Sequence, residues 1–179
     1  LTDARMSFYL STLLLVYVYV MRFYWQNRKD RIRKNRLLIG APAFFCILAV
    51  ACQIFYIPTD ARWQKINSVL SGRLELGCFG WRDYGFSLLG TKIEWIGFSH
   101  NATAGAYNYV DCSYMQILLE NGLIPLVIII AVYTYIMYMA VKEKDFYLQT
   151  AVLLITAFSI TEPRLLNLAY NPLPFFGIT

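Results

Sequence analysis

Charged residues are scarce in this sequence. Asp, Glu, Lys and Arg make up 15% of the 179 residues, against roughly 25% in soluble domains, whereas hydrophobic residues reach 58%. The ranges 37–57 and 123–141 contain no charged residue at all. Apolar runs of this length exceed those of a signal peptide or of an ordinary core helix. The composition therefore argues against a soluble globular domain.

Familiar catalytic and nucleotide-binding motifs are also missing. The sequence has one histidine and four cysteines, and it contains no metal-ligand cluster, P-loop, dinucleotide-binding fingerprint or nucleophile elbow. Cys46 and Cys52 lie in an apolar run, where we expect them to pack as small core residues. Cys78 and Cys112 fall in one predicted loop, and we expect them to stay unpaired, with a disulfide as the alternative. No cofactor or metal is predicted.

Long apolar runs are what the sequence has instead. A hydrocarbon layer of about 30 Å requires about 20 mostly apolar helical residues, and residues 6–25, 37–57, 123–141 and 146–161 approach or reach that length. Tyr and Trp crowd the ends of these runs, as in an interfacial aromatic belt. The pattern predicts an all-α, multi-pass transmembrane protein. Because the sequence opens without Met and stops inside a further apolar run, 165–179, we expect it to be the C-terminal part of one membrane domain.

The charge distribution predicts an orientation. Residues 22–36 carry seven basic residues and one acidic residue, and short loops of this kind stay in the cytoplasm. Alternation then places the N-terminus and 58–111 outside, 142–145 inside and 162–164 outside. The inner segments together hold nine basic and three acidic residues, and the remaining seven basic and eight acidic residues of the chain fall on the outer side. Topology alone thus explains the net charge of +5, and no nucleic-acid partner is predicted.

The predicted extracytoplasmic loop, 58–111, has features of ordered structure. Two N-cap residues precede apolar positions at helical spacing, which indicates an amphipathic helix lying on the membrane surface. The caps are Thr59 and Asp60, and the apolar positions are Trp63, Ile66 and Leu70. Gly72 is expected to end this helix. Later glycines are expected to divide the remainder into turns and short helices, and they are Gly77, Gly80, Gly85, Gly90, Gly97 and Gly105.

Ionisable side chains gather on the predicted outer side. They are Asp3, Arg5, Arg62, Arg73, Arg82, His100, Asp111, Glu120, Glu162 and Arg164. Charges near hydrocarbon are costly and are often functional, although outer-face charges at helix ends are also commonly just solvated. Any one of them is weak evidence, so their order along the chain is the more informative feature.

Five short elements follow one another in an order found in a known family. They are Thr2-Asp3-Ala4-Arg5, Ser71-Gly72-Arg73, Leu88-Leu89-Gly90, Asp111-Cys112-Ser113-Tyr114 and Gly122-Leu123-Ile124. Their order, spacing and common outer side resemble the C-terminal halves of bacterial polysaccharide polymerases of the O-antigen and capsule type. The resemblance extends over nearly the whole sequence. Cys112 departs from the Asn that is usual in the fourth element.

The resemblance implies a GT-C-like membrane glycosyltransferase with a large extracytoplasmic loop. Such enzymes transfer a glycan from polyprenyl diphosphate to the sugar end of another lipid-linked repeat unit. The reaction takes place at the outer face of the bacterial cytoplasmic membrane and needs no nucleotide sugar. The expected partners are therefore a polyprenyl-diphosphate-linked glycan donor and acceptor, the lipid bilayer, a flippase and a chain-length regulator.

Cleavage of the bond between sugar and diphosphate builds negative charge on the leaving group. Arginine suits this charge because its planar fork donates two hydrogen bonds and stays protonated. We expect Arg5 and Arg73 to bind the diphosphate, with Arg62, Arg82 and Arg164 in reserve.

The acceptor hydroxyl also needs a proton acceptor close to the membrane surface. Asp111 is the first candidate for this base, Glu162 the second and His100 the third. Tyr114 is expected to stack on a sugar or to orient Asp111.

Two other functions fit parts of the pattern. O-antigen ligases, which are related to the polymerases, carry a His-Asn pair before a similar Gly-Leu segment, and His100-Asn101 could be that pair. A transporter of polysaccharide precursors would place its polar groups at mid-membrane in broken helices, whereas these apolar runs are nearly free of charge between their ends.

Overall fold

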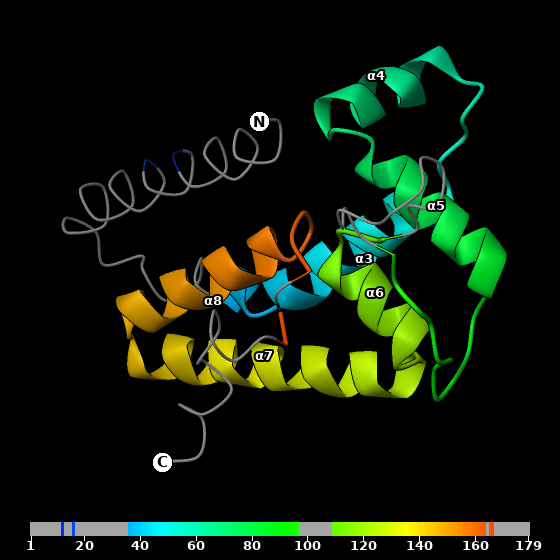
Figure 1. The fold of residues 1–179 in the computed structure, drawn as a ribbon. Coiled ribbons are helices and arrows are strands. Elements are labelled where there is room, and N and C mark those ends of the chain that lie inside the picture. The colour runs from blue at the N-terminus through cyan, green and yellow to red at the C-terminus, as the bar shows by residue number, and fades with distance from the viewer. Residues whose placement is uncertain (1–11, 13–15, 17–35, 97–108, 164, 167–179) are drawn as a thin grey trace.

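The computed structural model describes residues 12, 16, 36–96, 109–163, 165 and 166. Six helices lie entirely within this part of the chain (Figure 1). They are α3 (Ala41–Ile54), α4 (Ala61–Val69), α5 (Arg73–Tyr84), α6 (Ser113–Glu120), α7 (Leu123–Glu143) and α8 (Phe146–Phe158). The described residues contain no strand. The prediction of an all-α fold is therefore confirmed.

Helices α3, α7 and α8 pack on one another and form an apolar bundle. α7 and α8 run antiparallel, side by side (Figure 1). Their connecting turn is tight because Lys144 adopts a left-handed conformation, with φ of 60°. Asp145 then caps α8 by accepting hydrogen bonds from the N–H groups of Tyr147 and Leu148. Helix α6 packs against α3, α5 and α7 at the opposite end of the bundle.

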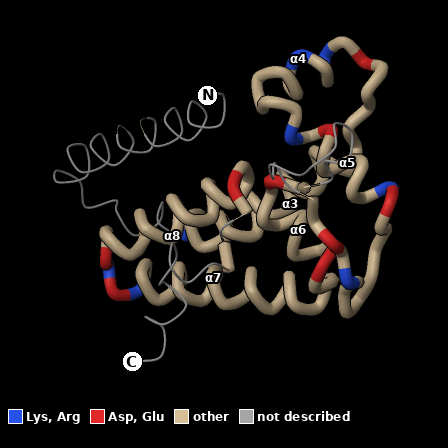
Figure 2. Tube along the Cα trace, viewed as in Figure 1, with Lys and Arg blue, Asp and Glu red and all other residues tan. Residues whose placement is uncertain are grey.

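Most charged residues in the described part of the chain lie toward the two ends of this bundle (Figure 2). The turn between α7 and α8 forms one charged end, and the region of α4, α5 and α6 forms the other. Along α7, exposed apolar side chains recur every three or four residues and so share one face. They are Ile124, Val127, Ile128, Val132, Tyr135 and Tyr138. The described residues leave this long apolar face uncovered.

One helix in the described part of the chain, α7, is long and apolar enough to cross a membrane. It has 21 residues and a mean hydropathy of 2.2. Helices α3 and α8 are apolar but shorter, with 14 and 13 residues, and they lie within the predicted runs 37–57 and 146–161. The predicted runs 6–25 and 165–179 lie almost wholly outside the described residues. The multi-pass arrangement therefore stays a prediction.

Helix α4 is the helix predicted within the outer loop. Asp60, rather than Thr59, is its N-cap, because the Asp60 carboxylate accepts a hydrogen bond from the Arg62 N–H at 2.7 Å. The helix ends at Val69, close to the predicted end at Gly72.

The prediction that Gly77 and Gly80 break the chain into turns is wrong. Both residues lie inside α5. A Cβ atom at Gly77 would lie 1.6 Å from the side chain of Gln53 on α3, and one at Gly80 would lie 3.0 Å from Val110. The missing side chains allow α5 to approach its neighbours closely, and this packing outweighs a helix-propensity cost of about 1 kcal/mol per glycine. Gly85, with φ of 70°, does end the helix.

All four cysteines are free thiols. Cys78 and Cys112 are each 1% exposed, and burial raises the pKa of the Cys112 thiol. The alternative of a disulfide between them is therefore not realised. Both residues pack as small apolar side chains.

Candidate functional site

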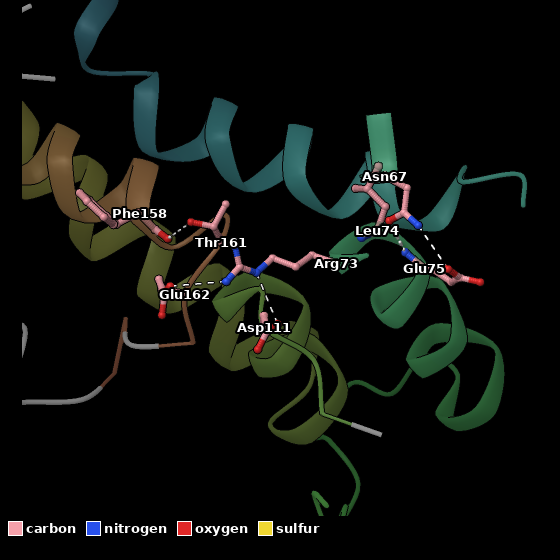
Figure 3. A network of polar contacts seen from close by, with 8 residues as sticks. All are labelled: Asn67, Arg73, Leu74, Glu75, Asp111, Phe158, Thr161 and Glu162. Carbon is pink, nitrogen blue, oxygen red and sulfur yellow. Dashed lines mark hydrogen bonds and ion pairs between the residues drawn. The ribbon is translucent and has the colours of Figure 1, made fainter. Parts of the chain in front are cut away.

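Three charged side chains from distant parts of the sequence meet at one end of the bundle (Figure 3). Arg73 Nε lies 3.4 Å from Asp111 Oδ2, and Arg73 Nη2 lies 3.6 Å from Glu162 Oε1. The Arg73 side chain is 6% exposed, whereas those of Asp111 and Glu162 are 23% and 20% exposed. We call these three residues the Arg73 cluster. Its guanidinium is buried, and its two carboxylates remain partly open to solvent.

The turn between α4 and α5 positions Arg73. Ser71 and Gly72 both adopt the left-handed conformation, with φ of 57° and 84°, and the chain reverses sharply before Arg73 begins α5. Glycine adopts this conformation without steric cost, whereas Ser71 pays about 1–2 kcal/mol for it. The Ser-Gly-Arg element therefore has a structural role, since its first two residues make the turn that carries the third.

Asn67 caps the helix that Arg73 begins. Its Oδ1 accepts hydrogen bonds from the N–H groups of Leu74 and Glu75, at 3.1 and 3.2 Å. Its Nδ2 donates to the Tyr56 hydroxyl and to Glu75 Oε2, both at 3.2 Å. The first N–H groups of a helix have no partner within it, and Gly72 at the N-cap position has no side chain to offer. Asn67 supplies that partner from the neighbouring helix α4.

Ser113 holds the two carboxylates of the Arg73 cluster in register. Its N–H donates to the Ser159 carbonyl at 3.0 Å. Its hydroxyl donates to the Glu162 carbonyl and accepts from the Leu165 N–H at 3.2 Å. The start of α6, just after Asp111, is thereby tied to the chain on both sides of Glu162. At 2% exposure, Ser113 makes these bonds away from competing water.

Two more elements of the resemblance contact each other. The first two N–H groups of α7 donate to the carbonyls of Ser87 and Leu88, at 3.0 and 3.2 Å. Gly90 and Gly122 have φ of 85° and 95°. A Cβ atom at Gly90 would lie 2.1 Å from the Glu120 carbonyl oxygen, and one at Gly122 would lie 2.4 Å from Gly90 N. Both positions require glycine because the two backbones touch.

The expected roles of Tyr114 find no support in its position. Its side chain is 0% exposed, so no face of the ring is open to a sugar. The hydroxyl donates to the Thr156 carbonyl at 2.6 Å rather than to Asp111. Burial raises the pKa of this hydroxyl, so it stays a neutral donor. Tyr114 is a core residue that joins α6 to α8.

The remaining predicted site residues are not brought into the Arg73 cluster. Arg62 lies on the exposed surface of α4. Arg82 is exposed near the end of α5, about 14 Å from Arg73 at a rise of 1.5 Å per residue. Arg5, His100 and Arg164 lie outside the described residues.

The Arg73 cluster is suited to proton transfer. A carboxylate that is fixed by a guanidinium and still partly exposed can accept a proton from a substrate hydroxyl. In the described ranges, no group of three or more His, Cys, Asp or Glu side chains could hold a metal ion. The Arg73 cluster itself offers two oriented carboxylates. Comparison with protein-family models, curated proteins and solved structures finds no match for this chain.

Proposed function

We propose that this chain belongs to a membrane glycosyltransferase that polymerises lipid-linked oligosaccharide repeat units into a surface polysaccharide. The donor is a glycan on polyprenyl diphosphate, and transfer takes place at the outer face of the bacterial cytoplasmic membrane. The Arg73 cluster is the observation that carries the proposal. It brings together the arginine of the Ser-Gly-Arg element, the aspartate of the Asp-Cys-Ser-Tyr element and the second candidate base, Glu162.

Stability alone gives a poor account of the Arg73 cluster. Burying an ion pair costs desolvation energy that its attraction often fails to recover, and apolar replacements are often as stable or more so. Here a 6% exposed guanidinium lies at the end of an apolar bundle, and the hydrogen bonds of Asn67 and Ser113 fix its surroundings. An arrangement held this firmly around two accessible carboxylates favours a chemical role.

The surface of the bundle supports a place in the membrane. The exposed side chains of α7 are apolar from Ile124 to Tyr138, while polar side chains such as Gln149 and Thr156 are buried inside the bundle. A soluble protein of this size rarely exposes so large an apolar face. In a bilayer the same face contacts acyl chains, and Gln149 and Thr156 donate hydrogen bonds to the carbonyls of Ala140 and Val152 within the bundle.

In the proposed reaction, Asp111 acts as the general base. Its carboxylate accepts the proton of the acceptor hydroxyl while the hydroxyl oxygen attacks the anomeric carbon of the donor. A new C–O bond forms, and the electron pair of the broken bond leaves with the diphosphate. Arg73 holds Asp111 and Glu162 in place. Glu162 is the second candidate for the base.

The contacts of Arg73 decide which arginines we propose as ligands of the diphosphate. Because the donor groups of Arg73 face Asp111 and Glu162, we assign Arg73 to positioning. We propose Arg5 and Arg164 as the diphosphate ligands. Arg5 belongs to the first element of the resemblance, and Arg164 follows Glu162 by two positions.

The test separates base from ligand. Asp111→Asn keeps the size of the side chain but removes the proton acceptor. We expect polymerisation by the purified complete protein to fall about 10²- to 10⁴-fold, with donor binding nearly unchanged. Chain growth is measured as a ladder on gels from a lipid-linked repeat unit, and donor binding is measured separately.

The control is Arg36→Ala, an exposed cation that precedes α3 on the predicted inner side, which should leave the ladder intact. A larger loss in Glu162→Gln than in Asp111→Asn moves the base to Glu162. Near-normal ladders from both carboxylate variants would reject the proposed mechanism. A wild-type protein that binds the lipid-linked unit without extending it would reject the proposed function.

A further inference from the structure

Three aromatic side chains gather near the segment that leads into Asp111, at the end of the bundle opposite the α7–α8 turn. The Trp95 ring is 6.0 Å from that of Tyr84 and 6.0 Å from that of Tyr109, with interplanar angles of 67° and 72°. We call these three residues the aromatic platform. They come from the end of α5, from the segment after it and from the segment before α6. None is fully buried, and Tyr84 is 36% exposed.

The orientation of Trp95 is fixed from outside the aromatic platform. Its indole Nε1 donates a hydrogen bond to Glu120 Oε2 at 3.1 Å. Glu120 is exposed at the end of α6, so its carboxylate also faces solvent beside the rings. The rings are therefore preorganised, with a polar acceptor at their edge. Preorganised aromatic surface binds at a lower entropic cost than mobile surface does.

The backbone before α6 links the aromatic platform to Asp111. Burial alternates along this segment, because Val110 and Cys112 are 0% and 1% exposed whereas Tyr109 and Asp111 are only partly buried. An alternation of this kind is typical of an extended chain. Residues two apart in an extended chain face the same side. Tyr109 and Asp111 therefore face the same accessible surface.

We propose that the aromatic platform and Glu120 form a carbohydrate subsite for the glycan whose hydroxyl is presented to Asp111. Pyranose rings offer apolar C–H faces that stack on aromatic rings, and their hydroxyls donate to carboxylates. A diphosphate would be repelled by Glu120, which makes the glycan the better occupant. The subsite rests on the proposed glycosyl transfer and names where the glycan binds during it.

Trp95→Ala tests the subsite in the complete protein. A subsite remote from the reacting bonds contributes similarly to the ground state and the transition state, so its loss raises KM and spares kcat. We expect the KM for the lipid-linked repeat unit to rise about 10-fold, as for the loss of one stacking contact. The kcat should stay within about 3-fold. Trp95→Phe should restore most of the affinity, because it retains a ring.

A second measurement does not depend on turnover. The water-soluble oligosaccharide released from the strain's own surface polysaccharide is titrated into each variant by calorimetry. We expect about 10-fold weaker binding for Trp95→Ala. We also expect weaker binding for Glu120→Gln, because a neutral amide accepts from sugar hydroxyls less strongly than a carboxylate does. Tyr84→Ala provides a second probe if Trp95→Ala is recovered in low yield, because Tyr84 is more exposed.

Tyr147 is the matched control, an aromatic residue that is 78% exposed at the opposite end of the bundle. Tyr147→Ala should leave both KM and oligosaccharide binding unchanged. A wild type that polymerises, together with a Trp95→Ala enzyme of normal KM and normal binding, overturns the subsite alone. A fall in kcat at normal KM also overturns it. Failure of the wild type to polymerise or to bind the oligosaccharide overturns the proposed function instead.

Discussion

Asn67 shows how much of the site depends on a residue that contacts no candidate catalytic group directly. Its amide satisfies two N–H groups at the start of α5 and a carboxylate of the same turn, so the direction of α5 at Arg73 depends on it. It is 7% exposed. Bonds to groups shielded from water cost more to lose than equivalent bonds at the surface.

Asn67→Ala should lower the free energy of unfolding by about 2 kcal/mol, because it removes a helix cap and leaves N–H groups without acceptors. Asn67→Asp should lose less, since a carboxylate accepts the same two bonds and favours the positive end of the helix. Its remaining cost comes from repulsion with Glu75. Thermal unfolding in detergent measures both variants. Ser68→Ala, on the exposed side of α4, is the control and should change little.

The Asn67→Asp variant also tests whether position 67 and Glu75 interact. If the repulsion argument is right, adding Glu75→Gln to Asn67→Asp should recover stability beyond the sum of the single changes. Additive effects would mean that Glu75 and position 67 do not interact as the structure has them.

For single residues, the sequence identifies candidates by residue type. It does not identify residues whose role depends on the contacts they make after folding. Arg73, Asp111 and Glu162 stand out because charges are rare in the sequence and lie near the ends of apolar runs. Asn67 and Ser113 have no such signal, since Asn and Ser occur throughout ordinary loops. Their roles depend on which backbone groups they meet after folding.

Among the helices, the role of glycine could not be predicted from local sequence. The spacing of apolar residues and the caps predict α4, and the charge-free run predicts α7, because these signals are local. Gly77 and Gly80 appear locally as breakers, yet both lie within α5, since the contact with Gln53 on α3 is a long-range one. A sequence pattern carries no record of how closely two helices will approach.

The contact between the Leu-Leu-Gly and Gly-Leu-Ile elements gives a prediction about packing. Gly90→Ala and Gly122→Ala would each place Cβ against backbone atoms, at 2.1 and 2.4 Å, and backbone cannot move aside as a flexible side chain can. The free energy of unfolding of each variant should fall by more than the roughly 1–2 kcal/mol that a left-handed conformation costs a residue with a side chain. Thermal unfolding compared with the wild type measures the loss.

Gly85→Ala separates strain from collision. Gly85 also has a positive φ, of 70°, but a Cβ there would meet nothing within 4 Å. The free energy of unfolding of Gly85→Ala should therefore fall only by the cost of the left-handed conformation, about 1–2 kcal/mol. Equal losses at positions 85, 90 and 122 would show that the two elements do not touch as closely as the structure places them.

In the described part of the molecule, most charged residues lie apart from the apolar face of α7. The turn between α7 and α8 and the region of α4 to α6 are charged, and the face of α7 between them is apolar and exposed (Figure 2). The Arg73 cluster and the aromatic platform both lie at the end opposite the α7–α8 turn. If α7 crosses the membrane, the two ends lie in different compartments, and both candidate sites share the one outside.

Labelling of single cysteines tests this arrangement. Asp83 and Lys144 are both exposed and lie at the opposite ends of the bundle. The inner side carries nine basic and three acidic residues and the outer side seven and eight, so the positive-inside rule places position 144 in the cytoplasm.

An impermeant thiol reagent should modify Asp83→Cys in intact cells and Lys144→Cys only after permeabilisation. The four native cysteines are replaced by Ala or Ser for the experiment, and the cysteine-free protein is the negative control.

Modification of position 144 but not of position 83 in intact cells would invert the topology and place the Arg73 cluster in the cytoplasm. Modification of both in intact cells would mean that α7 does not cross the membrane, and the assignment of an outer-face transferase would fail with it.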